Sequence, residues 1–287
     1  MNDPGNAPPK SGSSGLSNLQ LRVVSAVVLI VVVLAAAWAG GIWFSLLAIA
    51  IGAAMLYEWL TMTAALTRAY LRTEAMIGYA VIALLLLFGF SSISLVAATA
   101  GVALMIFIHA GMGRAALWPA GGLVYACLSA VALAVLRGGD AAGLVALLFL
   151  FAVVWATDIM AYFVGRALGG PKLAPSISPG KTWSGAVGGA VFAMLAGLGV
   201  AAYAGSPMSM PAILLFSLVL SAVSQAGDLF ESSIKRRFGF KDSGRLIPGH
   251  GGVMDRVDGL VAAAVLMFAI GAIMASGEPV AHPFFAR

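Results

Sequence analysis

The chain has 287 residues, of which 61% are hydrophobic and 9% charged, and it carries a net charge of +5. A mean hydropathy of +1.02 and repeated long apolar runs exclude an ordinary soluble protein and indicate a chain whose solvent is lipid. The single cysteine, Cys127, excludes an internal disulfide and a cysteine-based metal cluster.

The first segment, residues 1–21, is rich in Gly, Pro, Ser and Asn, which predicts a disordered tail. It has neither the apolar region nor the small-residue cleavage site of a signal peptide. The apolar run after Arg22 is therefore expected to remain in the protein as its first membrane anchor.

Apolar stretches long enough to cross a bilayer recur along the rest of the chain, since such a helix needs about 20 mostly apolar residues. They predict an all-α polytopic bundle of nine helices, at 23–39, 42–62, 75–90, 93–110, 119–136, 141–163, 185–203, 212–230 and 254–275. Residues 22–140 would hold the first five helices. Residues 141–276 would hold the last four, with polar cytoplasmic loops at 164–184 and 231–253, and residues 277–287 would form a short external tail.

Basic residues divide unequally between the two predicted faces of the membrane. Fourteen Lys and Arg fall on the side of the N-terminus, and only Arg137 and Arg287 fall on the other. Because cytoplasmic loops carry the excess of Lys and Arg, the N-terminus and both polar loops are predicted to be cytoplasmic. The positive charge thus has a topological explanation and does not call for a nucleic-acid partner.

Acidic residues gather at the same predicted face. Asp158 lies near the end of the sixth helix, and Asp228 near the end of the eighth. Asp255 and Asp258 open the ninth helix, three residues apart and so on one helical face. These carboxylates are ordinary solvated helix ends, partners for the nearby Arg and Lys, or a site, and the clustering of Asp228, Asp255 and Asp258 favours a site.

Carboxylates beside cations suit the chemistry of phosphates. Mg²⁺ takes one or two protein carboxylates and completes its shell with water and substrate phosphates. The glycines around His250 in PGHGG let the backbone approach a ligand and offer N–H groups to an anion, although PGHGG alone also fits a tight turn. Cations suited to phosphate oxygens lie on the same face at Lys181, Lys235, Arg236, Arg237, Lys241 and Arg245.

The segment SPGKT, residues 178–182, precedes the seventh helix and is similar to a phosphate-binding turn. Lys181 and the hydroxyl of Thr182 are available there to a phosphate, although the spacing is not that of a Walker sequence. Ser178 is equally suited to capping a helix. Gly185 and Gly189 form a G-x-x-x-G step, which favours helix packing.

The stretch SSIKRRFGFKDSGRLIPGHGGVMDRVDGL, residues 232–260, resembles the signature of the phosphatidate cytidylyltransferases, the integral membrane CDP-diacylglycerol synthases. The family pattern is Ser, an apolar residue and Lys-Arg, then Lys-Asp, Pro-x-His-Gly-Gly and Asp-Arg-x-Asp, and it is matched between Ser233 and Asp258. The likeness continues upstream through QAGDLFESSIK, SISPGKTWSG and DIMAYFVGR. Two positions depart from it, because the family commonly has Lys where Gly180 stands and Glu where Ser184 stands.

The resemblance implies the reaction of CTP with phosphatidate to give CDP-diacylglycerol and pyrophosphate, in phospholipid biosynthesis at the bacterial inner membrane. It also implies a requirement for Mg²⁺, with room for a second cation, and it leaves a homodimer open. The expected catalytic residues are Lys181, Asp228, His250, Asp255 and Asp258. The expected metal ligands are Asp228 and Asp255, with Asp158 and Asp258 as further candidates. The expected substrate contacts are Ser178, Lys181, Thr182, Lys235, Arg236, Lys241, Asp242 and Arg256.

Two alternatives stay open at the level of the sequence. One is a nucleotidyl- or phosphotransferase that acts on another lipid, such as an isoprenoid phosphate or alcohol. The other is a transporter whose intramembrane carboxylates carry protons or ions. The absence of an internal repeat, and the position of the acids at one face rather than the midplane, disfavour the transporter.

Overall fold

The computed structural model describes residues 18–275 and 277–286. The tail predicted at 1–21 therefore lies mostly outside the described residues. Its last part is already helical, because the first helix begins at Asn18.

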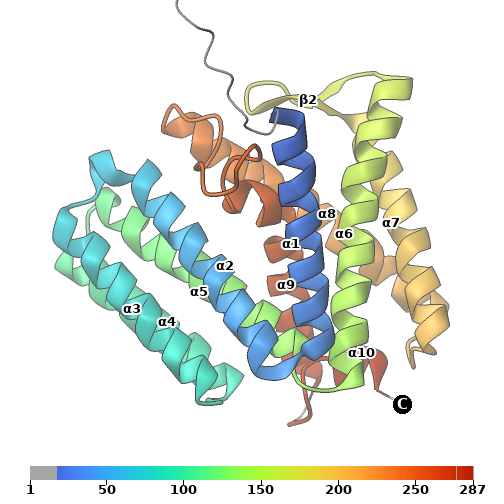
Figure 1. Ribbon diagram of the computed structural model, residues 1–287, viewed down its shortest axis with the longest axis horizontal. Helices are drawn as coiled ribbons and strands as arrows, with labels where there is room; N and C mark the ends of the chain where they lie inside the picture. The colour runs from blue at the N-terminus through green and yellow to red at the C-terminus, as the bar shows by residue number, and fades with distance from the viewer. Residues whose placement is uncertain (1–17, 276, 287) are drawn as a thin grey trace, which may run out of the picture.

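Helices make up nearly the whole of the described structure (Figure 1). The elements are α1 (Asn18–Ala39), α2 (Gly41–Met62), η1 (Ala64–Leu66), α3 (Ala69–Leu87), α4 (Ser92–His109), η2 (Arg114–Ala116), α5 (Leu117–Arg137), α6 (Ala141–Leu168), β1 (Lys172–Ala174), β2 (Ser178–Thr182), α7 (Trp183–Ala204), α8 (Met210–Arg237), α9 (Met254–Met274) and α10 (His282–Phe285). Within the described residues, α2 to α9 are eight helices long and apolar enough to cross a membrane, and α1 adds a shorter apolar stretch, Val23–Ala39. The predicted polytopic helical bundle is confirmed.

Three helices are longer than predicted, because polar helical turns extend their apolar segments. Helix α3 begins at Ala69 rather than at residue 75, α6 continues to Leu168, and α8 continues to Arg237. Basic side chains in the last turns of α6 and α8 favour these extensions, because they lie at the negative end of the helix dipole. The two polar loops are consequently 169–182 and 238–253, shorter than the predicted 164–184 and 231–253.

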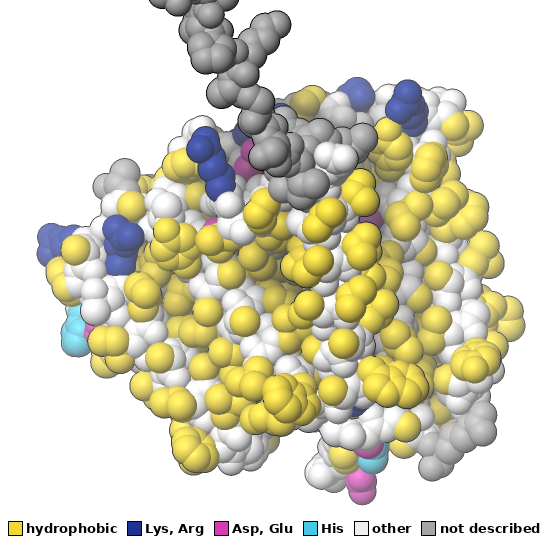
Figure 2. Space-filling model, in the orientation of Figure 1, with side chains coloured by type: hydrophobic (Ala, Val, Ile, Leu, Met, Phe, Trp, Pro, Cys, Tyr) yellow, Lys and Arg dark blue, Asp and Glu magenta, His cyan; other side chains and the backbone are white. Residues whose placement is uncertain are grey.

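The bundle has two groups of helices. Helices α2 to α5 form one group, in which α2 packs along α5, and α1 with α6 to α9 forms the other (Figure 1). Helix α5 also packs on α9 and so joins the groups. Large apolar side chains cover the visible flank of the molecule, as expected of a surface that faces lipid (Figure 2).

Helices α6 and α7 approach closely through small residues. A Cβ added at Gly185 would lie 2.5 Å from the carbonyl oxygen of Ala161, and one at Gly189 would lie 2.6 Å from that of Thr157. The predicted packing role of the G-x-x-x-G step is thereby confirmed. This contact fixes the position of the hairpin β1–β2, which connects the two helices.

Most visible Lys and Arg side chains gather at the end of the bundle that carries β2 (Figure 2). At the other end, Arg137 is buried and donates hydrogen bonds to the carbonyl oxygens of Ala37, Trp38 and Asp140. The predicted short tail also folds back there, since Phe284 and Phe285 of α10 are buried.

Candidate active site

A cavity opens at the basic end of the bundle, between α6, α7, α8 and the hairpin. Its volume is about 580 Å³, within the usual range for a small-molecule site. Polar side chains that line it are Asp158, Tyr162, Arg166, Lys172, Lys181, Thr182 and Gln225. The walls therefore combine one carboxylate with three cations, a composition suited to an anionic ligand and its counter-ion.

The hairpin brings Lys181 to this cavity. Strands β1 and β2 pair antiparallel, with Lys172 opposite Thr182 and Ala174 opposite Ser178. The segment predicted as a turn is thus a strand, which places Lys181 and Gly180 at the cavity wall. Thr182, not Ser178, caps the following helix, because its Oγ1 accepts a hydrogen bond from the N–H of Gly185 at 3.1 Å.

Lys181 forms an ion pair with Asp228 of α8. Lys181 lines the cavity, and both side chains are about 30% exposed, so the pair is accessible to solvent. The second oxygen of Asp228, Oδ1, lies 3.3 Å from the hydroxyl of Ser232, one turn along the same helix. The structure therefore joins two of the predicted catalytic residues, although they lie 47 positions apart in the chain.

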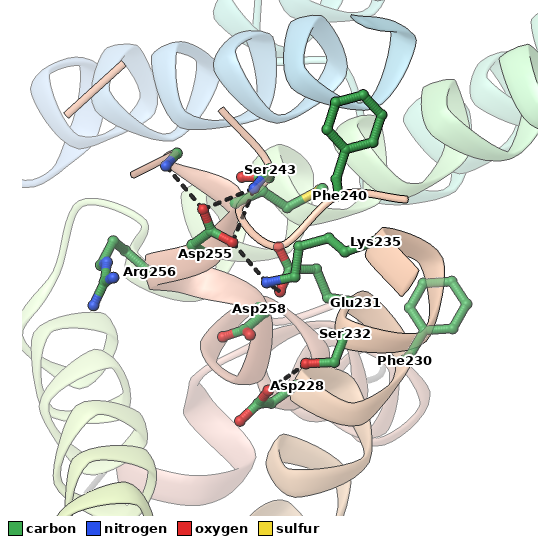
Figure 3. A network of polar contacts seen from close by, with 12 residues as sticks. Asp228, Phe230, Glu231, Ser232, Lys235, Phe240, Ser243, Asp255, Arg256 and Asp258 are labelled. Atoms are coloured by element: carbon green, nitrogen blue, oxygen red, sulfur yellow. Dashed lines mark hydrogen bonds and ion pairs between the residues drawn. The ribbon is translucent and has the colours of Figure 1, made fainter. Parts of the chain in front are cut away.

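A second ion-pair network lies beside the first and is largely buried. Lys235 Nζ lies 2.6 Å from Asp255 Oδ1 and 2.8 Å from Glu231 Oε2 (Figure 3). Glu231 is 1% exposed, and the ion pair with Lys235 compensates the charge of its buried carboxylate. Asp258 lies between this network and Asp228 in Figure 3, and it interacts electrostatically with both Glu231 and Asp228.

Asp255 is the most heavily hydrogen-bonded carboxylate of the site. Besides Lys235, it accepts the N–H of Ser243, at 3.1 Å to Oδ1 and 2.9 Å to Oδ2, and the N–H of Gly252, at 2.9 Å to Oδ2. The two backbone donors come from Ser243, inside the loop 238–253, and from Gly252, near its end. Asp255 thus ties the loop to the first turn of α9.

The PGHGG segment forms a tight reversal, in which Ile247 pairs with Gly251. Gly249 and Gly251 have φ values of 75° and 87°, which explains the need for glycine. His250 Nδ1 lies 3.0 Å from the hydroxyl of Ser25 in α1, and the His250 carbonyl accepts two hydrogen bonds from Arg256. Neither His250 nor Arg256 is among the residues that line the cavity described above.

The remaining predicted substrate contacts surround the site without entering this cavity. Arg236 donates to the carbonyl oxygens of Ile177, at 3.4 Å, and Phe240, at 3.1 Å, while Lys241 and Asp242 are exposed in the loop. Ser178 lies at the start of β2, away from the cavity lining.

Several residues of the site were not predicted. Tyr162, Arg166 and Lys172 line the cavity, and Gln225 faces it three residues before Asp228. The helical spacing of Gln225 and Asp228 was a usable signal, since residues three apart share a face. In the sequence, Arg166 and Lys172 counted only toward the excess of basic residues that predicts the cytoplasmic face.

The carboxylates of the site could hold a divalent metal only together with other ligands. In the residues that the structure describes, no three His, Cys, Asp or Glu side chains are arranged to hold one. Mg²⁺ needs only one or two carboxylates when substrate phosphates complete its shell. Asp228 and Asp258 fit that requirement better than Asp255, because Asp228 meets two donors, Lys181 and Ser232, and Asp258 meets one, the N–H of Gly259. Asp255 meets three donors, and Asp158 interacts electrostatically with Asp228 and Asp258.

Comparison with known proteins identifies the family of this chain. The chain matches the model of the Cytidylyltransferase family over residues 20–274. It is 49% identical over 271 residues to the phosphatidate cytidylyltransferase of Brucella abortus, covering 94% of this chain and 99% of that protein, and the values for Brucella suis are the same. The phosphatidate cytidylyltransferase of Haemophilus influenzae is 46% identical over 125 residues, 42% of this chain and 43% of that protein. With a family match that spans most of its length and relatives that align almost end to end, the chain is a multi-pass membrane protein that belongs to the cytidylyltransferase family.

Proposed function

We propose that this chain transfers the cytidylyl group of CTP to phosphatidate, giving CDP-diacylglycerol and pyrophosphate. The observation that carries the proposal is the cavity of Lys181, Arg166 and Lys172 beside the Asp228 ion pair, at one end of an apolar bundle. A water-soluble nucleotide can reach such a site from solution, and a lipid can reach it from the membrane. Membership of an enzyme family favours this reading over a transporter.

The cavity suits the triphosphate of the nucleotide. Its three cations approach from different elements, Arg166 from α6, Lys172 from β1 and Lys181 from β2. Cations on several sides of a polyphosphate neutralise its charge and hold it in a defined orientation. Lys181 is the cation nearest to the carboxylates, since it already contacts Asp228.

The reaction is an in-line displacement at the α-phosphorus of CTP. An oxygen of the phosphatidate phosphate forms the new P–O bond, the bond from the α-phosphorus to the bridging oxygen breaks, and pyrophosphate leaves with that electron pair. The attacking phosphate is already ionised at neutral pH, so no strong general base is needed. Positioning and charge neutralisation supply most of the catalysis in such transfers.

Mg²⁺ is part of the proposal, with Asp228 and Asp258 as the residues that would hold it and Asp158 beside them. When bound, it supplies charge neutralisation at the phosphates. Lys181 would then be shared between Asp228 and a phosphate oxygen. Asp255 keeps the loop 238–253 in place in this account, and its predicted role as a metal ligand remains to be tested.

The proposed orientation puts the site on the cytoplasmic face. The supporting observation is the excess of Lys and Arg at the end of the bundle that carries the cavity. CTP is a cytoplasmic metabolite, so the same orientation places the cavity on the side of its substrate.

The lipid acceptor is the feature to test first. Purified protein in detergent would receive labelled CTP and Mg²⁺ with phosphatidate, with an isoprenoid phosphate or with an isoprenoid alcohol. We expect labelled lipid with phosphatidate alone. Label in an isoprenoid product, with none in phosphatidate, would contradict the proposed substrate and leave the family assignment unchanged.

A further inference from the structure

A buried carboxylate from the N-terminal half of the chain reaches the loop 238–253. Glu58 lies near the end of α2 and is 1% exposed. Its Oε1 accepts the N–H of Val253 at 2.8 Å, and its Oε2 accepts the N–H of Met254 at 2.8 Å and the hydroxyl of Ser243 at 2.9 Å. These partners lie 185 to 196 positions further along the chain.

The environment explains how a charge is tolerated there. A buried carboxylate is costly unless hydrogen bonds or opposite charges compensate it. No Lys, Arg or His within the described ranges forms an ion pair with Glu58, so its compensation comes from the three donors and from the N-terminus of α9. That helix has no side-chain cap of its own at Val253, and Glu58 accepts two of its otherwise unpaired N–H groups.

The loop is shaped to enclose this carboxylate. A Cβ added at Gly244 would lie 2.7 Å from Oε1 of Glu58, and one at Gly252 would lie 2.6 Å from both of its carboxylate oxygens. Any larger residue at either position would displace Glu58 or the loop. The two glycines therefore allow the loop backbone to approach the carboxylate of Glu58 closely.

Glu58 and Asp255 each accept hydrogen bonds from both ends of the segment 243–253. At Ser243 the hydroxyl binds Glu58 and the N–H binds Asp255. At the other end the N–H of Gly252 binds Asp255, and the next N–H, of Val253, binds Glu58. The two carboxylates thus hold the loop from opposite sides, one from α2 and one from α9.

We propose that Glu58 is a positioning residue of the active site, through which the N-terminal helices fix the loop 243–253 and the first turn of α9. That turn carries Asp255 and leads to Asp258, so a loss of Glu58 would displace both. The activity readout of this proposal rests on the proposed function. Its structural readout does not.

The test compares Glu58→Gln with Glu74→Gln as a matched control. Gln keeps the size of the side chain but loses its charge and half of its acceptors, while Glu74 pairs with His109 on the surface of α3 and α4. We expect Glu58→Gln to lower kcat at least tenfold and to change the KM for CTP less than threefold, because the cavity is built by other elements. We expect Glu74→Gln to leave both within twofold.

Hydrogen exchange read by mass spectrometry gives the second readout. In Glu58→Gln, exchange of the amides in residues 243–254 should rise at least tenfold, while the hairpin 172–182 stays as in the wild type. Ser243→Ala removes one donor only and should give a smaller change in the same segment. It serves as the test variant if Glu58→Gln does not fold.

Unchanged exchange and kcat in the test variant would overturn the proposal. Exchange raised equally in the hairpin would also overturn it, because Glu58 would then stabilise the whole protein rather than the loop. If the wild type itself transfers no cytidylyl group, the proposed function fails, and the exchange pattern still decides the role of Glu58.

Discussion

Lys181 is predicted to carry most of the electrostatic work of the hairpin in binding phosphate. It is the cation of the cavity that contacts a carboxylate, and its ammonium group is accessible from the cavity. Lys181→Met keeps the length of the side chain and removes the charge. A hydrogen bond to a charged group contributes about 1.5–3 kcal/mol, which corresponds to a loss of roughly tenfold to a hundredfold in kcat/KM.

The assay is incorporation of labelled CTP into phosphatidate at several CTP concentrations. Arg237→Met is the control, because Arg237 lies over the ring of Trp118, 5.2 Å from its centroid, and outside the cavity lining. The control should stay within twofold of the wild type. A loss of similar size in both variants would show that overall positive charge matters, not the contact of Lys181.

Gly180 offers a position to which the positive charge of Lys181 can be moved. A Cβ at Gly180 would meet no atom within 4 Å, and its φ does not lie in the left-handed region. Gly180→Lys alone should therefore change kcat/KM no more than a few-fold. The double variant, Gly180→Lys with Lys181→Met, should stay impaired. Its recovery to near wild-type activity would refute a specific contact by Lys181.

Two further predictions concern the metal and the topology. Asp228→Asn and Asp255→Asn should each lower activity at least roughly a hundredfold, about 3 kcal/mol. Only Asp228→Asn should raise the Mg²⁺ concentration needed for half-maximal activity. A raised Mg²⁺ requirement in Asp255→Asn would instead identify Asp255 as a metal ligand. Topology is tested with the variants Glu278→Cys and Leu246→Cys in a Cys127→Ala background, since both positions are exposed. An impermeant thiol reagent on intact cells should label Glu278→Cys and not Leu246→Cys. The reverse pattern would contradict a cytoplasmic site.

Hydropathy was sufficient to predict the helical bundle, because an apolar run of suitable length has few other structures in a membrane. It could not predict the ends of α6 and α8, where helix geometry continues after hydropathy falls. The strand at Ser178–Thr182 was missed for a similar reason. Its glycine and proline indicate a turn locally, and only pairing with Lys172–Ala174 makes it a strand.

The sequence indicated the region of the site but not which residues line its cavity, since Lys181 and Thr182 do so and His250 does not. The spacing of Asp255 and Asp258 and the nearby cations indicated phosphate chemistry. The pairing of Lys181 with Asp228 depends on how α7 and α8 pack, and the contact of Glu58 with Met254 joins opposite halves of the chain. The backbone N–H groups of Ser243 and Gly252 that Asp255 accepts could not be predicted either, because a carboxylate pattern carries no information about donors that the fold brings to it.

The central claim is that the cavity at the basic end of the bundle carries out cytidylyl transfer to phosphatidate. The most direct measurement uses purified protein, phosphatidate and Mg²⁺ with CTP labelled separately at its α- and γ-phosphates. The account predicts the α-label in the lipid, the γ-label in pyrophosphate, and one pyrophosphate released for each lipid formed. A γ-label in the lipid would indicate phosphoryl rather than cytidylyl transfer, and it would contradict the account.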